Sequence, residues 1–292
     1  MVIERRIELL SIENKTIEYS VVGQGEPILV MHGGHSNCKE EFGYKGLVEN
    51  GYSIITPSRA GYGRTSKEVG TNLSLACECY VRLLDHLNIE KVHILAISAG
   101  GPSGIYLASN YPERIRTLTL QSAVTKTWLT PKDKEYKAAK LLFNPKTEKF
   151  TWRLISSMTN IFPRFIFKQM FPSFSKLKCN EVKDKWTEDD VEAVKEMNNR
   201  QRSGTGFLID LAQINEISRA NLHAITCPTL IMHSKHDSSV PLEHPYYAHE
   251  YIPSSKLCLL DSWGHLIWLG ISSHETDEMI NKFLKSNKMI VE

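Results

Sequence analysis

Short runs of apolar residues alternate with stretches of helical character along most of this 292-residue chain. The runs are continuous rather than alternating, so they predict strands that are buried on both faces. The predicted strands span residues 28–31, 53–56, 92–97, 115–120, 228–233 and 255–260. The predicted helices span residues 39–50, 73–87, 104–110 and 273–285. This alternation predicts an α/β fold with a mostly parallel, doubly wound sheet that helices cover on both faces.

Two regions depart from this rhythm. Arg5–Ile12 and Thr16–Val22 are two β-like runs joined by a short turn, which predicts a hairpin. From about residue 124 to residue 216 the chain lacks a clear strand and contains several helical stretches. We therefore expect one α/β core, formed by residues 1–123 and 217–292, with residues 124–216 inserted as a helical cap.

The composition narrows the function only by exclusion. Hydrophobic residues make up 41% and charged residues 23% of the chain, as in ordinary globular proteins, and the net charge of +2 gives no argument for a nucleic-acid partner. Charges at residues 4–8 interrupt any signal-peptide core, and apolar runs are too short to span a membrane, so we expect a cytoplasmic protein. The six cysteines are interpreted as reduced, buried thiols, and no cofactor is expected.

Ser98 lies where a strand, a tight turn and a helix follow one another, in Lys91–Tyr106, KVHILAISAGGPSGIY. Small residues after the serine allow the helix to pass close to the strand, and the hydroxyl then stands at the strand's carboxyl end. A serine in such a turn also occurs as a helix cap or in a phosphate loop. The segment Ala96–Gly100 nevertheless resembles the nucleophile elbow G-x-S-x-G of the α/β-hydrolase family, with Ala96 in place of the first glycine.

A serine hydroxyl is a weak nucleophile, so it needs a general base, and the base needs an orienting acid. Asp237 follows the predicted strand at 228–233 in a D-x-x-V-P setting that resembles the family's acid loop. His265 follows the last strand and is preceded by a glycine, which is similar to the family's setting for the base. Asp261 is the second choice for the acid. His233 and His236 beside Asp237 lack a third ligand cluster, so a metal site is not favoured.

Two loops complete the resemblance. His32-Gly33-Gly34-His35 is similar to the family's H-G-G loop, which implies that the backbone N–H groups of Gly34 and Ala99 form an oxyanion hole and that His32 braces the loop. Residues 58–66 resemble the family's D-x-x-G-x-G-x-S loop, with Ser58 in place of the aspartate. This replacement puts a local structural contact in doubt.

The first part of the expected cap is basic and aromatic. Residues 124–180 contain 12 Lys/Arg and 3 Asp/Glu, a net charge of 12 − 3 = +9. Fourteen apolar residues lie between positions 143 and 174 of this segment, and they include Phe143, Phe150 and Trp152. Three interpretations remain open. In the first, the apolar residues form the core of the cap and the lysines form a solvated face. In the second, the apolar residues line a pocket for an apolar acyl or aryl group. In the third, a basic amphipathic helix docks on a membrane surface.

The ordered set of motifs resembles the α/β-hydrolase fold family with a helical cap. The resemblance implies a serine hydrolase that cleaves a small or medium carboxylester, thioester or lactone with an apolar acyl part through an acyl-enzyme, with a small-molecule substrate under the cap. Alternatives are an amidase or aminopeptidase, a C–C bond hydrolase with the same triad, or a non-catalytic ligand-binding protein of this fold. The sequence leaves the oligomeric state open.

Overall fold

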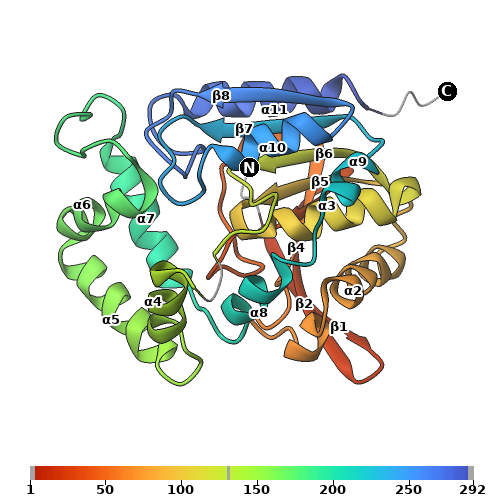
Figure 1. Cartoon of the computed structure of the whole chain (residues 1–292), viewed down its shortest axis with the longest axis horizontal. Coiled ribbons are helices and arrows are strands. Elements are labelled where there is room, and N and C mark those ends of the chain that lie inside the picture. Colours follow the sequence, from red (N-terminus) through yellow and green to blue (C-terminus); the bar gives the residue numbers. More distant parts are fainter. Residues whose placement is uncertain (1–3, 130–131, 289–292) are drawn as a thin grey trace.

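The computed structural model describes residues 4–129 and 132–288 and contains one eight-stranded sheet (Figure 1). The strand order is β1-β2-β4-β3-β5-β6-β7-β8. β1 and β2 form an antiparallel hairpin, β2 pairs antiparallel with β4, and all later pairs are parallel. The strands are β1 (Arg5–Ile12), β2 (Lys15–Gly23), β3 (Glu26–Met31), β4 (Tyr52–Pro57), β5 (Val92–Ile97), β6 (Ile115–Gln121), β7 (Thr229–Ser234) and β8 (Ser255–Leu260). The predictions of an N-terminal hairpin and a mostly parallel sheet are confirmed.

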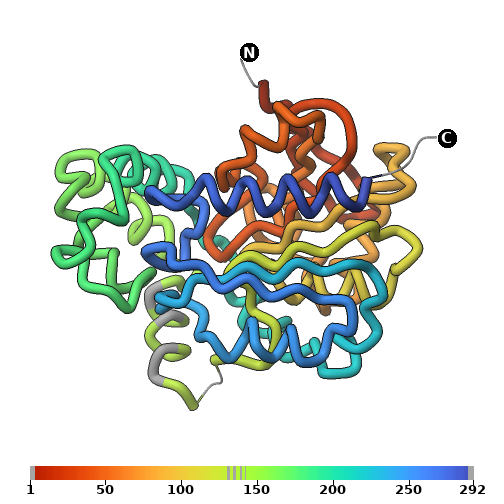
Figure 2. Tube along the Cα trace, turned by 90° about the horizontal axis from the view of Figure 1, so that it is seen from above, coloured from red at the N-terminus to blue at the C-terminus, as the bar shows by residue number. Residues whose placement is uncertain are grey.

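Helices cover both faces of this sheet, and each face has its own hydrophobic core. One core is built on α2 (Leu73–His86), α3 (Gly101–Asn110) and α10 (Glu243–Tyr251), and α9 (Arg219–His223) packs against α3. The other core is built on α1 (Lys45–Glu49) and α11 (Ser273–Lys285). Figure 2 shows α11 crossing one face of the sheet, with α10 on the opposite face. The fully buried residues of β4 and β5 explain why these strands read as continuous apolar runs.

The helix expected over residues 39–50 is wrong in its first half. α1 begins only at Lys45, because Gly43 has a φ of 79° and interrupts the helical backbone. The Arg5 guanidinium also donates to the carbonyl oxygens of Cys38 and Glu40, which satisfies these groups outside a helix. The strands at 92–97 and 255–260 and the helix at 273–285 have the predicted bounds.

Of the helices that the structure describes between β6 and β7, the five that precede α9 are here called the inserted helices. They are α4 (Lys134–Leu142), α5 (Glu148–Ile161), α6 (Pro163–Phe174), α7 (Glu188–Arg200) and α8 (Gly206–Gln213). α5, α6 and α7 pack on one another, and they stand to one side of the sheet in Figure 1. A third hydrophobic core joins α6 and α7 to the loop after β8, where Phe171 stacks on Trp263 at a ring distance of 4.9 Å. Among the residues described, no helix is both long and apolar enough to cross a membrane.

Candidate active site

Ser98 occupies a strained turn between β5 and α3, with a φ of 50°. Close packing requires the glycines after it: a Cβ on Gly100 would lie 2.1 Å from the Met31 carbonyl oxygen, and one on Gly101 would lie 2.1 Å from that of Val124. Ala96 is accommodated because Gly104 faces it, where a Cβ would approach the Ala96 Cβ to 2.6 Å. A positive φ outside glycine is costly and is maintained here by the surrounding structure.

Ser98, His265 and Asp237 form one hydrogen-bonded chain. The Ser98 Oγ lies 3.0 Å from His265 Nε2, and His265 Nδ1 lies 2.7 Å from Asp237 Oδ2. Asp237 is fully buried, and its Oδ1 accepts hydrogen bonds from the N–H groups of Ser239 and Val240. Burial raises the pKa of Asp237, but the charge and hydrogen bond of His265 outweigh burial and hold the pKa below its ordinary value of 3.8. The carboxylate therefore stays ionised and orients the imidazole.

The end of α6 holds the histidine loop in place. The His265 N–H donates to the Phe174 carbonyl oxygen at 2.8 Å, and the Ser122 hydroxyl donates to the His265 carbonyl oxygen. Gly264 is required at this contact, because a Cβ there would lie 2.4 Å from the same Phe174 oxygen. A single antiparallel bridge also joins Ser175 to Asp237. The end of α6 therefore contacts both the Asp237 loop and the His265 loop. The sequence did not predict these contacts, because they join segments that are far apart along the chain.

The remaining acid and histidine candidates near this site have other partners. Asp261, the second choice for the acid, is exposed and pairs with His236 and Lys185, each at 2.9 Å. His233 is fully buried near the end of β7. Its Nε2 lies 2.9 Å from the Val240 carbonyl oxygen and 3.3 Å from Asp237 Oδ2, the same oxygen that His265 contacts. Across the described residues, no group of three or more His, Cys, Asp or Glu side chains is arranged to hold a metal ion.

The loop after β3 lies directly against the serine turn. A Cβ on Gly33 would lie 3.5 Å from the Ser98 Cβ, and one on Gly34 would lie 3.8 Å from the Ala99 Cβ. His32 is fully buried at the base of the loop, where its Nδ1 donates to the Gly33 carbonyl oxygen and its Nε2 accepts the Arg59 N–H at 2.9 Å. Burial lowers the pKa of His32 well below 6.5, so the ring is neutral and can accept this hydrogen bond.

A buried ion pair ties this loop to α8. The Arg59 guanidinium donates twice to the Asp210 carboxylate, which also accepts the Tyr62 hydroxyl at 2.6 Å. The same guanidinium donates to the carbonyl oxygens of His32, at 2.8 Å, and Gly33, at 3.3 Å. Arg59 and Asp210 are only 3% and 7% exposed. Sequence analysis assigned no contact to Asp210, yet Asp210 holds the side chain that fixes the His32–Gly33 loop.

Glu18 of β2 supplies the carboxylate that the family pattern has at position 58. The Ser58 hydroxyl donates to Glu18 Oε2 at 2.8 Å, and the Arg64 guanidinium donates to Glu18 Oε1. Burial raises the pKa of Glu18, but these hydrogen bonds outweigh burial and lower the pKa below 4.5. The contact that the Ser58 replacement put in doubt is therefore made from a different strand.

Aromatic side chains of α5, α8 and the α4–α5 connection cover His35, the residue after Gly34. The His35 ring lies 4.2 Å from the Phe143 ring, 5.3 Å from Trp152 and 4.4 Å from Phe207. His35 Nδ1 and Trp152 Nε1 both hydrogen-bond the Ser203 hydroxyl. Burial lowers the pKa of His35 to about 3, so the ring is neutral. These four rings form an uncharged, largely apolar wall beside the Gly34 loop.

The strained serine after β5, with an acid after β7, a histidine after β8 and a glycine loop after β3, is the arrangement of one family. The chain belongs to the α/β-hydrolase fold family, because residues 26–269 match the family described as alpha/beta hydrolase fold. It is similar to the uncharacterized hydrolase YcgS of Bacillus subtilis (strain 168), with 60% identity over 283 residues that cover 97% of this chain and 100% of YcgS.

Solved structures share this fold. An alpha/beta hydrolase fold protein from Nakamurella multipartita matches with a TM-score of 0.82 and 24% identity, covering 97% of this chain and 100% of that one. An esterase from Exiguobacterium antarcticum matches with a TM-score of 0.69 and 21% identity, covering 95% and 98%. At this level of identity the two likenesses establish the fold.

Proposed function

We propose that this protein is a serine hydrolase that cleaves a small or medium carboxylester, thioester or lactone through an acyl-enzyme. The hydrogen-bonded chain from Ser98 through His265 to Asp237 carries this proposal. The name of the 60% identical relative, a hydrolase, supports the reaction class. A serine, an imidazole and a buried carboxylate at these distances form the constellation that activates a hydroxyl for attack on a carbonyl carbon.

In the proposed reaction His265 Nε2 accepts the Ser98 proton as the Oγ bonds to the substrate carbonyl carbon. The resulting imidazolium is stabilised by the ionised Asp237 at 2.7 Å. His265 then donates the proton to the leaving alcohol or thiol. In the second half of the reaction a water molecule loses its proton to the same nitrogen and releases the acid, and Ser98 recovers its hydrogen.

The N–H groups of Gly34 and Ala99 are the proposed donors to the oxyanion. The close approach of the Gly34 loop to Ala99 supports this role, because both N–H groups belong to backbone beside the Ser98 side chain. Loss of one such donor costs about 10²–10³ in kcat in comparable sites. His32 and Arg59 would hold the loop in the productive position without touching substrate.

The inserted helices are proposed to act as a cap over the site, with the wall of His35, Phe143, Trp152 and Phe207 beside the acyl part. Four uncharged rings at distances of 4.2 to 5.6 Å favour an apolar group over a charged one. This supports an apolar acyl part.

Labelling with a fluorophosphonate probe, followed by hydrolysis of p-nitrophenyl esters of increasing acyl length, tests the proposal. Ser98→Ala and His265→Ala should abolish labelling and reduce kcat by at least about 10⁴-fold. Ser157→Ala, an exposed serine on α5, is the matched control and should leave both unchanged. A well-folded wild-type protein that neither labels nor hydrolyses any ester would contradict the proposal and favour a ligand-binding role. Turnover of anilides or of vinylogous diketones in preference to esters would redirect it to an amidase or a C–C hydrolase.

A further inference from the structure

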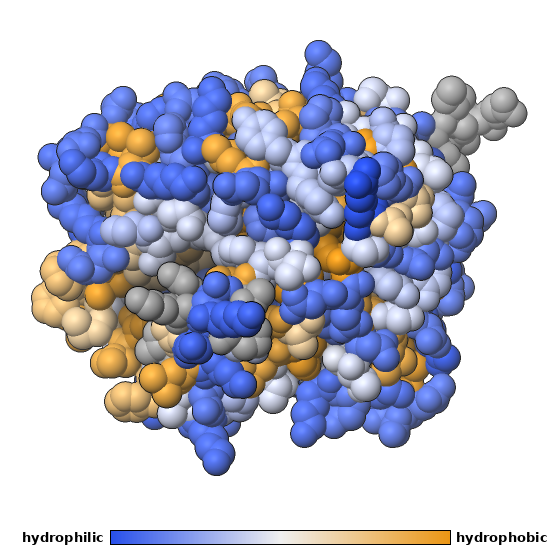
Figure 3. Space-filling model, in the orientation of Figure 1, coloured by the Kyte–Doolittle hydropathy of each residue, from blue (hydrophilic) through white to orange (hydrophobic). Residues whose placement is uncertain are grey.

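The outer side of α5 and the start of α6 carry a row of exposed large apolar side chains. Each is more than half exposed, and we call the set the apolar face: Phe150, Leu154, Ile161, Phe162 and Phe165. Residues 150, 154 and 161 lie on one side of the helix because their spacing is four and seven. Trp152 and Thr159, on the other side of α5, are buried. Figure 3 shows hydrophobic residues gathered where Figure 1 places α5 and α6.

A hydrophobic core inside the cap does not account for all of these apolar residues. Of the fourteen apolar residues in the segment, Trp152, Phe167 and Phe171 are buried in the protein, whereas the apolar face points to solvent. Five large apolar residues exposed side by side are unusual on a monomer surface and indicate an interaction site.

The sequence segment that carries the apolar face is cationic, although its Arg164 pairs with Glu188 of the neighbouring α7. Residues 134–174 contain eight Lys/Arg and two Asp/Glu, a net charge of 8 − 2 = +6, against +2 for the whole chain. One of the two acidic residues, Glu148, is buried and accepts two hydrogen bonds from Arg202. Lys149 and Arg153 are exposed on α5, and neither forms an ion pair with any residue that the structure describes. A surface with this charge is complementary to an anionic partner.

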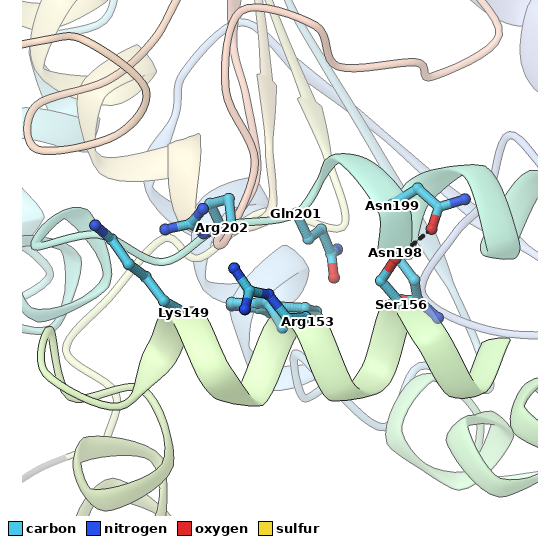
Figure 4. A pocket seen from close by; sticks show the side chains of 8 residues that line it. Lys149, Arg153, Ser156, Asn198, Asn199, Gln201 and Arg202 are labelled. Atoms are coloured by element: carbon cyan, nitrogen blue, oxygen red, sulfur yellow. Dashed lines mark hydrogen bonds between the residues drawn. The ribbon is translucent and has the colours of Figure 1, made fainter. Parts of the chain in front are cut away.

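A small basic pocket adjoins the apolar face. It has a volume of about 210 Å³ and lies between α5 and the end of α7, and its lining includes Lys149, Arg153, Arg202, Asn199 and Gln201. Figure 4 shows the Lys149, Arg153 and Arg202 side chains lying next to one another along this opening. Arg202 is paired with Glu148, and the exposed Lys149 and Arg153 beside it suit a phosphate group.

We propose that the apolar face and this pocket dock the protein on an anionic phospholipid bilayer, with a headgroup phosphate in the pocket and the five apolar side chains below the headgroups. An exposed apolar row flanked by lysine and arginine on one helix is the arrangement of helices that lie in the membrane interface. The attraction is electrostatic as well as apolar, so docking weakens as salt screens the charges. The proposal does not depend on the proposed hydrolase activity.

Flotation with vesicles tests the proposal, using phosphatidylcholine alone or with about one third phosphatidylglycerol. Wild-type protein should float with the anionic vesicles at least about tenfold more than with the neutral ones. Phe150→Ser with Phe162→Ser, and Lys149→Glu with Arg153→Glu, should each reduce binding at least about tenfold. The matched controls are Leu9→Ser with Ile271→Ser and Lys45→Glu with Lys256→Glu, which change exposed residues of similar kind elsewhere and should retain binding. Circular dichroism checks the fold of each variant.

Three results would overturn the proposal. A folded wild-type protein that stays with neither vesicle shows that the face does not dock on lipid. Equal flotation with both vesicles shows that the basic pocket has no part in it. A wild-type dimer in sedimentation equilibrium that Phe150→Ser with Phe162→Ser converts to a monomer shows that a second copy of the chain covers the apolar face.

Discussion

Replacing Asp210 with asparagine removes one charge and little volume from the buried contact between α8 and the Gly34 loop. Asp210 accepts two hydrogen bonds from Arg59 and one from Tyr62. Arg59 also donates to the carbonyl oxygens of His32 and Gly33. After the substitution the guanidinium would remain buried without a counter-ion, beside a loop that depends on its position.

The size of the effect follows from burial. Arg59 and Asp210 are 3% and 7% exposed, and removing one partner of such a buried pair costs about 3–5 kcal/mol of unfolding free energy. For a chain of this size that loss lowers the melting temperature by on the order of 10 °C. Displacement of the His32–Gly33 carbonyls would also misplace the Gly34 N–H, so kcat should fall by up to about 10²–10³ with a smaller change in KM.

Urea unfolding and ester hydrolysis of Asp210→Asn measure the two effects separately. Glu188→Gln is the matched control, because Glu188 and its partner Arg164 form a pair whose side chains are 57% and 68% exposed. Breaking that exposed pair should cost less than about 1 kcal/mol and leave kcat unchanged. If Asp210→Asn costs no more than Glu188→Gln, the buried pair does not stabilise the fold as argued. If it destabilises the protein but leaves kcat unchanged, Arg59 does not position the oxyanion loop.

Two further predictions concern single carboxylates. Asp237→Asn keeps the shape of the residue but removes the charge that orients His265. We expect kcat to fall about 10⁴-fold with stability nearly unchanged. A fall in kcat of less than about tenfold would show that another group orients the imidazole. Asp277 is partly buried on α11, and burial raises its pKa to about 6 from an ordinary 3.8. The folded protein therefore binds this proton more tightly than the unfolded chain, and the stability contributed by the protonated form is lost as pH rises from about 4 through 6. Asp277→Asn should raise the melting temperature at pH 8 and not at pH 4, and an equal change at both pH values would contradict the burial argument.

Local pattern was sufficient for much of the fold. The bounds of β5, β8 and α11 agree with the sequence predictions. Buried strands and amphipathic helices each require a characteristic spacing of apolar residues, and this spacing is visible in the sequence. The positions of Ser98, Asp237 and His265 just beyond the ends of β5, β7 and β8 follow from the same reading. The prediction failed at residues 39–44, where Arg5, more than thirty residues away, satisfies the backbone carbonyls of a non-helical loop.

The sequence alone thus determined the α/β class, the order of the strands along the chain, and the candidate residues at the strand ends. Only the tertiary structure decided that Glu18 takes the place of the aspartate missing at Ser58, that Asp210 holds the oxyanion loop through Arg59, and that Phe174 fixes the His265 loop. It also decided which aromatic residues of α5 and α6 are core and which form an exposed face. The physical reason is that hydrophobic periodicity reports only on neighbours within one helix or strand. The contacts named here join residues that are separated by between 40 and just over 150 positions in the sequence, and their proximity depends on how the helices and strands pack.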